Sequence, residues 1–389
     1  MNTSPVGEKP VVVLLGNYPV DRQESMLRFR NLIEARLTAA GYTTESIYPQ
    51  GYFGMMLRQG PLAKWLGYLD KYILFPTKLA GALGQFAEKK YSGRKVVVHI
   101  CDHSNAVYAR LARRWFPVLV TCHDLLAVRG ALGEDTDCPA SGFGKRLQAT
   151  ILHGLGQASR VACVSRATQG DLIRLLGPGM AERSEVIPLA LNYDYRALTR
   201  DEALAGLARA GIDLPFGGYV LHVGSGLRRK NREALLQSVA RIKDQWPGKI
   251  VFAGEALSDA ERMLALDLGV KNRVHEISRP DNETLLALYA AAHAFIFMSR
   301  FEGFGWPILE AQMAGCPVIC SNRTSVPEVA GDGAFIHEPD DYASIGAAIL
   351  RLEDAALRSE MISQGLKNAR LYSNERMMSA YEVIYRQIQ

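Results

Sequence analysis

Two carboxylates flank a glycine-rich turn in the second half of the chain. Glu302 and Glu310 enclose the segment Gly303-Phe304-Gly305-Trp306-Pro307-Ile308-Leu309, which follows an apolar run typical of a buried strand. Glycines let the backbone approach a ligand closely, and a proline suits the first turn of a helix. Amides at a helix start attract phosphate, and a carboxylate can accept hydrogen bonds from ribose hydroxyls, so this order favours a nucleotide site. Spacing alone fits a strand-to-helix connection with two solvated carboxylates equally well.

A cationic loop follows another strand-like run earlier in the chain. It contains Gly224, Ser225, Gly226, Leu227, Arg228, Arg229 and Lys230. Such cations neutralise the charge that grows on a leaving diphosphate, although cations in a row are also common on solvated surfaces. A nicotinamide dehydrogenase is disfavoured, because Arg229 stands where the dinucleotide fingerprint needs its third glycine.

Short runs rich in valine and isoleucine alternate with helical patterns along the whole chain, which predicts βαβ units and parallel sheets. The first series includes residues 11–15, 96–100, 118–122 and 161–164, and the second residues 219–223, 250–252, 274–277, 294–298 and 317–320. Two consecutive series predict an α/β chain with two doubly wound, Rossmann-like domains.

The domain boundary is expected near residue 205, since residues 191–216 are charged, carry Gly and Pro and lack strand character. The domains would then be residues 1–205 and 206–372. Residues 373–389 form a third segment with apolar residues at helical spacing, which predicts a helix that packs on another part of the chain. Its apolar residues are Met377, Met378, Tyr381, Ile384 and Tyr385.

Composition describes an ordinary globular protein. The 389 residues exceed the usual size of a single core, and 48% are hydrophobic and 22% charged. No run approaches the ~20 apolar residues of a membrane-spanning helix, and residues 1–9 lack the apolar core of a signal peptide, so a cytoplasmic location is expected. The net charge of +5 suits an anionic ligand or an acidic membrane surface, and no nucleic-acid partner is expected.

The cysteines predict neither disulfides nor zinc. Six cysteines are too few for a disulfide framework, and none has the partners of a zinc site. Four lie in strand-like runs and are expected to be buried thiols: Cys101, Cys122, Cys163 and Cys320. The segment Asp135-Thr136-Asp137 resembles a metal-binding DxD motif, but it falls between Gly133 and Pro139 and is interpreted as a plain loop, so no metal site is expected.

Glu302 and Glu310, separated by seven residues around Gly-Phe-Gly, resemble the signature of the retaining family-4 glycosyltransferases. The similarity continues through residues 311–319 and 325–332 and upstream through residues 281–292, and thus spans the second domain. The resemblance implies the GT-B fold: two Rossmann-like domains facing each other across a deep cleft, with the C-terminal helix packing back toward the N-terminal domain. It also implies retaining, metal-independent transfer of a hexose, without a cofactor. The donor would be a UDP- or GDP-linked sugar and the acceptor a hydroxyl of a glycan or a lipid-linked molecule.

The same resemblance implies roles for individual residues. Glu310 would bind the donor ribose, Glu302 the transferred sugar, and Lys230 with Arg229 the donor phosphates. Many members carry an arginine where this chain has Ser225, so the identity of the second cation stays open. His123, at the end of a strand-like run, would contact the sugar, although a single strand-end histidine is usually structural. The remaining donor-binding residues would be Gly16, Asn17, Gly224, Ser225, Gly303, Phe304, Gly305 and Ile308. Three others are acceptor-side candidates that the sequence does not rank: His99, Asp102 and His103.

Residues 61–95 carry an apolar helical stripe with lysines nearby. The stripe contains Leu62, Trp65, Leu66, Leu69, Tyr72 and Ile73, and the nearest lysines are Lys64, Lys71 and Lys78. Such a segment can lie on an anionic bilayer, which would place the protein peripherally on the inner face of the cell membrane, or it can pack onto its own domain.

Bacterial surface-polysaccharide or glycolipid synthesis is the commonest setting of the family that the chain resembles. Two alternative functions fit the same fold: a GT-B-type sugar-nucleotide epimerase and a non-catalytic partner subunit of a transferase. The donor base would be read around residues 276–279, and no residue identifies the base or the sugar.

Overall fold

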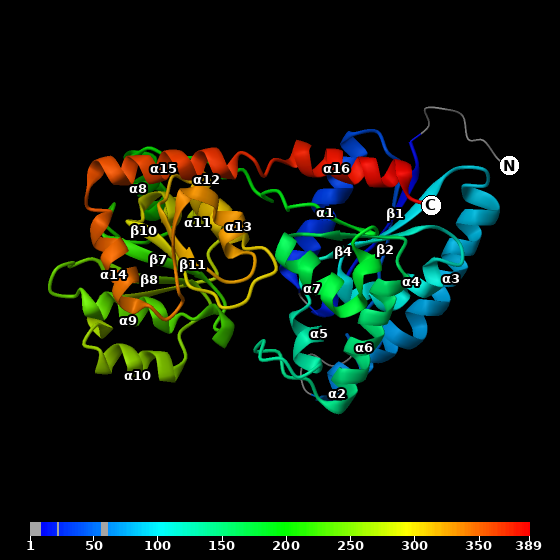
Figure 1. Cartoon of the computed structure of the whole chain (residues 1–389), viewed down its shortest axis with the longest axis horizontal. Coiled ribbons are helices and arrows are strands. Elements are labelled where there is room, and N and C mark those ends of the chain that lie inside the picture. The colour runs from blue at the N-terminus through cyan, green and yellow to red at the C-terminus, as the bar shows by residue number, and fades with distance from the viewer. Residues whose placement is uncertain (1–8, 22, 56–60) are drawn as a thin grey trace. The chain divides into compact units, whose positions relative to one another are not determined.

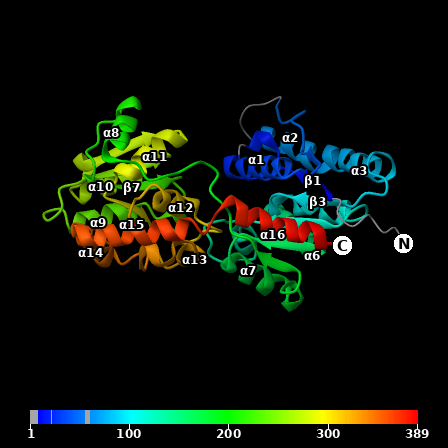
Figure 2. The same cartoon turned by 90° about the horizontal axis from the view of Figure 1, so that it is seen from above.

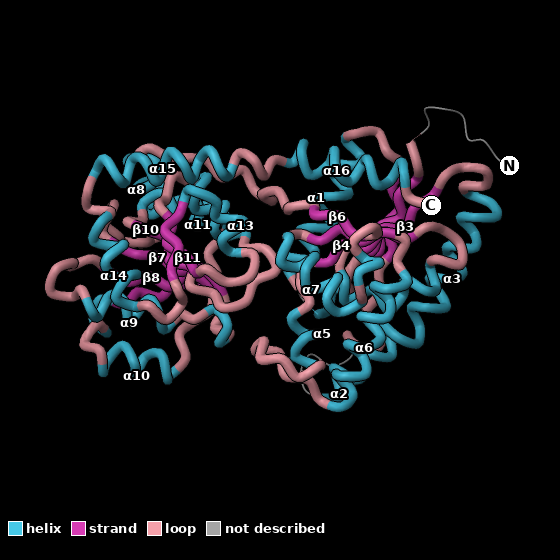
Figure 3. Tube along the Cα trace, viewed as in Figure 1, coloured by secondary structure: helices cyan, strands magenta, loops and turns pink. Residues whose placement is uncertain are grey.

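The computed structural model describes residues 9–21, 23–55 and 61–389, so the chain start, on which the signal-peptide expectation rests, lies outside the described residues. The chain forms two compact units. The N-terminal unit extends to Pro188 and also includes Glu375–Gln389, and the C-terminal unit is Leu189–Asn374. Each unit contains one six-stranded sheet whose observed pairings are all parallel, with helices packed around it (Figure 1, Figure 3). The predicted α/β class with two doubly wound sheets is confirmed.

The sheet of the N-terminal unit has the strand order β2-β1-β3-β4-β5-β6. Its strands are β1 (Val11–Leu15), β2 (Thr44–Ile47), β3 (Val96–Ile100), β4 (Val118–Cys122), β5 (Arg160–Cys163) and β6 (Ser184–Val186). Its helices are α1 (Glu24–Ala39), α2 (Pro61–Leu69), α3 (Phe75–Gln85), α4 (Ala109–Ala112), α5 (Leu126–Ala131), α6 (Gly142–Gln157), α7 (Arg166–Leu176) and α16 (Asn374–Gln387). The strand order reverses between β1 and β3, and ligands of open α/β sheets bind beyond the carboxyl ends of strands at such a point.

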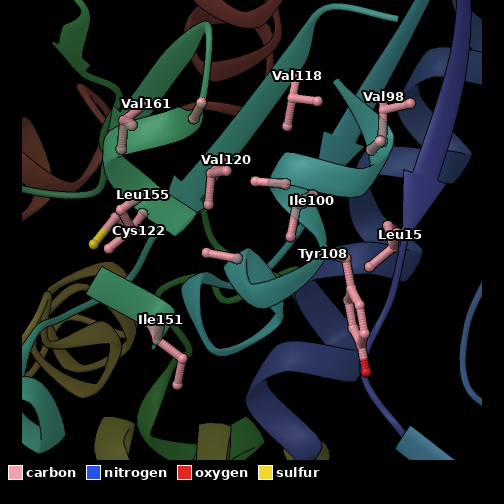
Figure 4. Packing of buried hydrophobic residues seen from close by; sticks show 14 of the residues in the cluster. Leu15, Val98, Ile100, Tyr108, Val118, Val120, Cys122, Ile151, Leu155 and Val161 are labelled. Carbon is pink, nitrogen blue, oxygen red and sulfur yellow. The ribbon is translucent and has the colours of Figure 1, made fainter. Parts of the chain in front are cut away.

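The core of this unit explains why its central strands are nearly pure runs of apolar residues. Every residue of β1, β3 and β4 is buried, as expected of parallel strands that are covered on both faces. On one face, alternate strand residues such as Val98 and Val120 pack against Ile151 and Leu155 of α6 (Figure 4). The buried thiols Cys101, Cys122, Cys163 and Cys320 are confirmed.

Helix α16 packs on the N-terminal unit, as the family resemblance implied (Figure 1, Figure 2). Its two buried tyrosines meet polar side chains that project from the sheet. The Tyr385 hydroxyl lies 2.8 Å from His99 Nδ1, and the Tyr381 hydroxyl lies 2.9 Å from Thr121 Oγ1. Thr121 Oγ1 is also 2.8 Å from His99 Nε2, which completes a buried chain of hydrogen bonds.

These hydrogen bonds correct the expectation that His99 lies on the acceptor side. His99 is fully buried, and burial lowers its pKa to about 3, so the ring is neutral. Both ring nitrogens are engaged, Nδ1 by Tyr385 of α16 and Nε2 by Thr121 of β4. His99 is therefore a core residue and not an acceptor-side residue.

Replacing Tyr385 by phenylalanine is expected to destabilise the N-terminal unit by about 1–3 kcal/mol, because a buried nitrogen of His99 loses its partner. The matched control is Val383→Ala, since Val383 lies on the same helix and is 47% exposed. Urea denaturation combined with amide hydrogen exchange in β3 and β4 measures the difference. A Tyr385→Phe protein as stable as the Val383→Ala protein would contradict the prediction.

The sheet of the C-terminal unit has the strand order β12-β11-β10-β7-β8-β9. Its strands are β7 (Tyr219–Gly224), β8 (Lys249–Gly254), β9 (Val274–Ser278), β10 (Ala294–Phe297), β11 (Val318–Ser321) and β12 (Ala334–His337). Its helices are α8 (Arg200–Arg209), α9 (Glu233–Arg241), α10 (Asp259–Asp267), α11 (Asn282–Ala291), α12 (Trp306–Met313), α13 (Val326–Ala330), α14 (Tyr342–Arg351) and α15 (Ala355–Ala369). The order reverses between the adjacent strands β7 and β10.

The units divide after Pro188 and not near residue 205. The reason is α8, which packs on α11 of the C-terminal unit. A Cβ atom on Gly206 would lie only 2.7 Å from the Cβ atom of Ala287, so the two helices approach closely at this glycine. Residues 191–216 lack strands, as expected, yet this contact attaches them to the second unit.

In the described ranges, no helix combines the length and the apolar character needed to cross a bilayer. Among the same residues, no group of three or more His, Cys, Asp or Glu side chains could hold a metal ion.

Candidate functional site

Two loops converge at the point where the strand order of the C-terminal sheet reverses. The chain leaves β7 into residues 225–230 and leaves β10 into residues 298–305, and β7 and β10 are adjacent parallel strands. Because both loops leave the carboxyl ends of their strands, they meet at one edge of the sheet. The structure thus joins the cationic loop and the glutamate loop, which were predicted as separate elements.

A partly buried ion pair connects these loops. Lys230 Nζ lies 2.6 Å from Glu302 Oε1, and the two residues are 72 positions apart in the chain. Arg229 NH1 lies 3.6 Å from Glu302 Oε2. Burial alone would raise the pKa of Glu302, but Lys230 and Arg229 together hold it below its ordinary value. Glu302 is therefore ionised at neutral pH, and the cluster carries two positive charges and one negative charge.

Hydrogen bonds that involve backbone atoms hold the cluster in place. The Arg300 amide donates to the Arg229 carbonyl at 2.8 Å, and Arg229 NH1 donates to the Phe301 carbonyl at 3.2 Å. The Glu302 amide donates to Thr324 Oγ1 at 3.0 Å. The charged side chains therefore sit on a loop pair that is already ordered, which lowers the cost of binding an anion.

Glycines make both turns possible. Gly305 has a φ of 115°, a left-handed conformation that strains other residues, and it is the residue from which α12 begins. At the other loop, Gly224 and Gly254 are paired across β7 and β8. A Cβ atom on Gly254 would lie 2.5 Å from the Gly224 carbonyl oxygen, so this edge of the sheet has no room for a side chain there.

Glu310 lies in α12 and is 8% exposed. Its Oε2 accepts a hydrogen bond from the Tyr289 hydroxyl at 3.0 Å. Burial, together with the charge of Glu310, raises the pKa of Tyr289 well above its ordinary value, so Tyr289 remains a hydrogen-bond donor. The tyrosine thus fixes the orientation of the Glu310 carboxylate.

Two residues expected to bind the donor are instead used inside the unit. Phe304 is 6% exposed and packs edge to face on Tyr372, with 5.8 Å between ring centroids. Ile308 is fully buried, and its amide donates to the Gly305 carbonyl at 3.0 Å. The amide of Ile308 at the start of α12 is thus already engaged by a hydrogen bond within the turn. Ser225 and Gly303 remain partly exposed in the two loops.

In the N-terminal unit, His123 follows β4 directly and is 6% exposed. Its Nε2 lies 2.9 Å from the Cys101 carbonyl, and since a carbonyl only accepts, Nε2 carries the proton. Burial lowers the pKa of His123, and its ring packs edge-on against Phe29. In the neutral ring Nδ1 is therefore a hydrogen-bond acceptor. It can accept a hydrogen bond from a hydroxyl group but cannot donate one.

Asn17 is held in a buried network at the β1 and β3 ends. Its Nδ2 donates to Asp102 Oδ2 at 2.5 Å, and its Oδ1 accepts from Asn105 Nδ2 at 3.0 Å. Asn105 Nδ2 also lies 3.4 Å from the Gly16 carbonyl, and His103 Nδ1 lies 3.1 Å from Asp102 Oδ1. Gly16, Asn17 and Asp102 thus belong to one structure that shapes the loop after β1.

A cavity of about 500 Å³ opens beside this network, within the N-terminal unit. Asn17, Tyr18 and Asn105 line one part of it, Tyr68 and Tyr72 another, and Gln148 of α6 a third. Sequence reasoning named Asn17 and, in the apolar stripe, Tyr72, but it missed Tyr68, Asn105 and Gln148. The available signal was the polar run after β3, in which Ser104 and Asn105 follow Asp102 and His103 directly.

Buried Asp70 was also missed. It accepts hydrogen bonds from the Tyr18 hydroxyl at 2.6 Å and from the Gly54 amide at 2.9 Å. Burial raises its pKa, but these bonds and those from the amides of Tyr52 and Phe53 hold the pKa below its ordinary value. The charge of Asp70 therefore fixes the loop at residues 52–54 beside the cavity.

Comparisons with known proteins agree with this geometry. Residues 217–368 match the model of the family "Glycosyl transferases group 1". The O-antigen chain mannosyltransferase B of Escherichia coli is 31% identical over 247 residues, which are 61% of this chain and 64% of that protein. The chain thus spans less than two thirds of this relative's length.

Solved structures extend the similarity to the whole chain. Sucrose-phosphate synthase from Thermosynechococcus elongatus has a TM-score of 0.72 at 21% identity, with 98% of this chain and 99% of that one covered. Anabaena HepE in complex with UDP and glucose has a TM-score of 0.70 at 17% identity, with 97% and 99% covered. Residues 217–368 are therefore similar to the glycosyl transferases group 1, and the chain has the GT-B fold.

Proposed function

We propose that this protein transfers a hexose from a UDP- or GDP-linked donor to an acceptor hydroxyl, with retention of the anomeric configuration. The observation that carries the proposal is the cluster of Lys230, Arg229 and Glu302 at the end of β7 and β10. Two cations and one carboxylate match a substrate in which a diphosphate is joined to a neutral, hydroxyl-rich sugar.

In the proposed reaction, the bond between the anomeric carbon and the diphosphate oxygen breaks, the acceptor oxygen bonds to the anomeric carbon on the same face of the sugar, and the acceptor proton passes to the departing diphosphate. Lys230 and Arg229 stabilise the charge that develops on the leaving diphosphate, which is the work that a divalent cation performs in other transferases. Glu302 accepts hydrogen bonds from sugar hydroxyls. Because Lys230 and Arg229 hold its pKa low, Glu302 is a weak base, which suits a binding role better than a covalent one.

Glu310 and His123 complete the proposed substrate contacts. The carboxylate of Glu310, fixed on one side by Tyr289, binds the ribose hydroxyls. His123, with its Nε2–H engaged by the Cys101 carbonyl, accepts a hydrogen bond from a sugar hydroxyl through Nδ1. In this proposal Asn17 acts as a positioning residue, because its side chain is committed to Asp102 and Asn105.

The proposed setting is bacterial surface-polysaccharide or glycolipid synthesis at the inner face of the cell membrane. The similarity to an O-antigen chain mannosyltransferase supports this setting and makes mannose the first sugar to test. The acceptor is a hydroxyl of a glycan or of a lipid-linked saccharide.

Thermal unfolding in the presence of a panel of nucleotides and nucleotide sugars tests the proposal. A donor bound at 100 times its dissociation constant should stabilise the fold by about 2.7 kcal/mol, which raises the melting temperature of the C-terminal unit by several degrees. Adenosine nucleotides and free hexoses serve as controls. If no UDP- or GDP-linked compound shifts the unfolding temperature, the proposed donor site is wrong.

Incubation with the stabilising donor alone separates the alternatives. A transferase hydrolyses the donor slowly when no acceptor is present, since water replaces the acceptor. A GT-B-type epimerase would convert the donor rapidly to an altered sugar, and a non-catalytic partner would leave it unchanged. Either of the last two results would replace the proposed function.

A further inference from the structure

An uncovered apolar face lies on the N-terminal unit. Four side chains at helical spacing on α2 and the turn that follows it point outward: Leu62, Trp65, Leu69 and Ile73 are 62%, 56%, 38% and 61% exposed. The sequence left open whether this stripe packs onto its own domain. The structure leaves these four side chains exposed in large part, while Leu66 and Tyr72 are partly buried. The side chain of Lys64, named with this stripe above, lies outside the described residues.

A distant segment extends the face. Phe143, at the start of α6, is 44% exposed and lies 5.3 Å from Trp65 between ring centroids. Tyr68 contacts both rings: its ring centroid lies 5.6 Å from that of Trp65 and 5.2 Å from that of Phe143. Trp65, Tyr68 and Phe143 form what we call the aromatic cluster. Aromatic rings gathered and exposed in this way mark an interaction surface.

The charges around the aromatic cluster select its partner. Lys145 and Arg146 follow Phe143 on α6 and are exposed. Lys71 Nζ lies 5.2 Å from the Tyr68 ring centroid and pairs with Asp21 at 2.8 Å. An apolar centre of Trp and Leu with basic flanks matches the boundary layer of an anionic bilayer, where rings enter the acyl region and cations meet lipid phosphates.

The aromatic cluster is continuous with the cavity of the N-terminal unit. Tyr68 belongs to both, and Leu147, one helical turn after Phe143, lines the cavity. The lining also carries amide side chains, from Asn17, Asn105 and Gln148. A molecule that is apolar at one end and rich in hydroxyls at the other would therefore meet matching surfaces on both sides of Tyr68.

We propose that Leu62, Trp65 and Phe143 dock this protein onto an anionic bilayer, so that the cavity opens beside the lipid headgroups. This inference deepens the proposed function in one respect: the acceptor is lipid-linked rather than free in water. The docking itself does not depend on the sugar-transfer reaction.

Sedimentation of the full chain with vesicles tests the proposal. The probes are 100 nm vesicles of dioleoyl phosphatidylcholine alone, and of the same lipid with one quarter dioleoyl phosphatidylglycerol, at low salt. The protein should bind the anionic vesicles, and its partition coefficient should fall at least tenfold on the neutral ones. The double variant Trp65→Ser/Phe143→Ser should lose at least tenfold in binding to anionic vesicles, and Lys145→Glu/Arg146→Glu should remove the preference for phosphatidylglycerol.

The matched control is Met263→Ser/Leu266→Ser, which removes two apolar side chains of similar exposure from α10 in the C-terminal unit. It should bind vesicles as the unsubstituted chain does. Circular dichroism and thermal unfolding establish that each variant is folded. No binding by the unsubstituted chain, equal binding to both lipid compositions, or full binding by Trp65→Ser/Phe143→Ser would each overturn the proposal. Since these vesicles contain no nucleotide sugar, failure here is distinct from failure of the thermal-shift test of the donor site.

Discussion

Replacement of Lys230 by alanine is expected to lower the rate of sugar transfer by about 10²- to 10³-fold, the range seen when one preorganised electrostatic group is removed from an active site. The Nζ atom of Lys230 sits in a mostly buried place beside Glu302, where little water competes for its charge. Without it, the leaving diphosphate has Arg229 alone, and Glu302 loses its nearest cation. Affinity for the free nucleoside diphosphate should fall as well.

Initial rates of transfer and calorimetric titration with the nucleoside diphosphate measure these effects. Lys271→Ala is the matched control, because Lys271 is an exposed lysine in the same unit. Lys230→Arg should retain part of the activity, since the charge is kept but its position shifts. Unchanged turnover by a folded Lys230→Ala protein would remove Lys230 from the proposed site.

Replacement of Glu302 by glutamine is expected to lower transfer by about 10²-fold or more, also through lost transition-state stabilisation, but to affect nucleotide binding in the opposite direction. Glutamine has nearly the same shape, so the loop should keep its fold. The change removes the negative charge that now neutralises part of Lys230 and Arg229. The free nucleoside diphosphate, which lacks the sugar, should therefore bind Glu302→Gln as tightly as the unsubstituted chain or more tightly.

The contrast between the two variants is the sharper test. Titration of each protein with the nucleoside diphosphate should show weaker binding for Lys230→Ala and equal or stronger binding for Glu302→Gln. The control for the second variant is Glu338→Gln, an exposed carboxylate that pairs with Arg323 at 2.5 Å. If Glu302→Gln loses nucleotide affinity in parallel with Lys230→Ala, Glu302 stabilises the loop and does not bind the sugar.

Much of the fold follows from local sequence. Strands β1, β3 and β4 occupy the residues expected. A parallel strand that is buried on both faces is a nearly continuous run of apolar residues, which is easy to find in the sequence. Three strands were missed, namely β2, β6 and β12, and all three lie at sheet edges. An edge strand is covered on fewer sides and so tolerates polar residues, as the sequence Thr-Glu-Ser-Ile of β2 shows.

The histidines show where local sequence stops being informative. His99 and His123 both lie at or just beyond the ends of strands; the family resemblance assigned His123 to the sugar, whereas His99 was one of three unranked acceptor-side candidates. The side chain of His99 points to the face that α16 covers, so both of its nitrogens bond to Tyr385 and Thr121. His123 lies one residue beyond β4 and bonds through Nε2 to a carbonyl. Only the packing of α16, which lies far along the chain, distinguishes the role of His99 from that of His123.

By itself, the sequence determined the strand-turn-helix order that carries Glu302 and Glu310 and the cations that follow β7, because glycine, proline and charge act locally. Strand order decided that Lys230 and Glu302 form an ion pair, since β7 and β10 are neighbours only in the folded sheet. Packing decided that Ile308 is engaged within its own turn. Tertiary structure likewise brought Phe143 to Trp65, because burial and side-chain contacts depend on residues far apart in the chain, which no local pattern records.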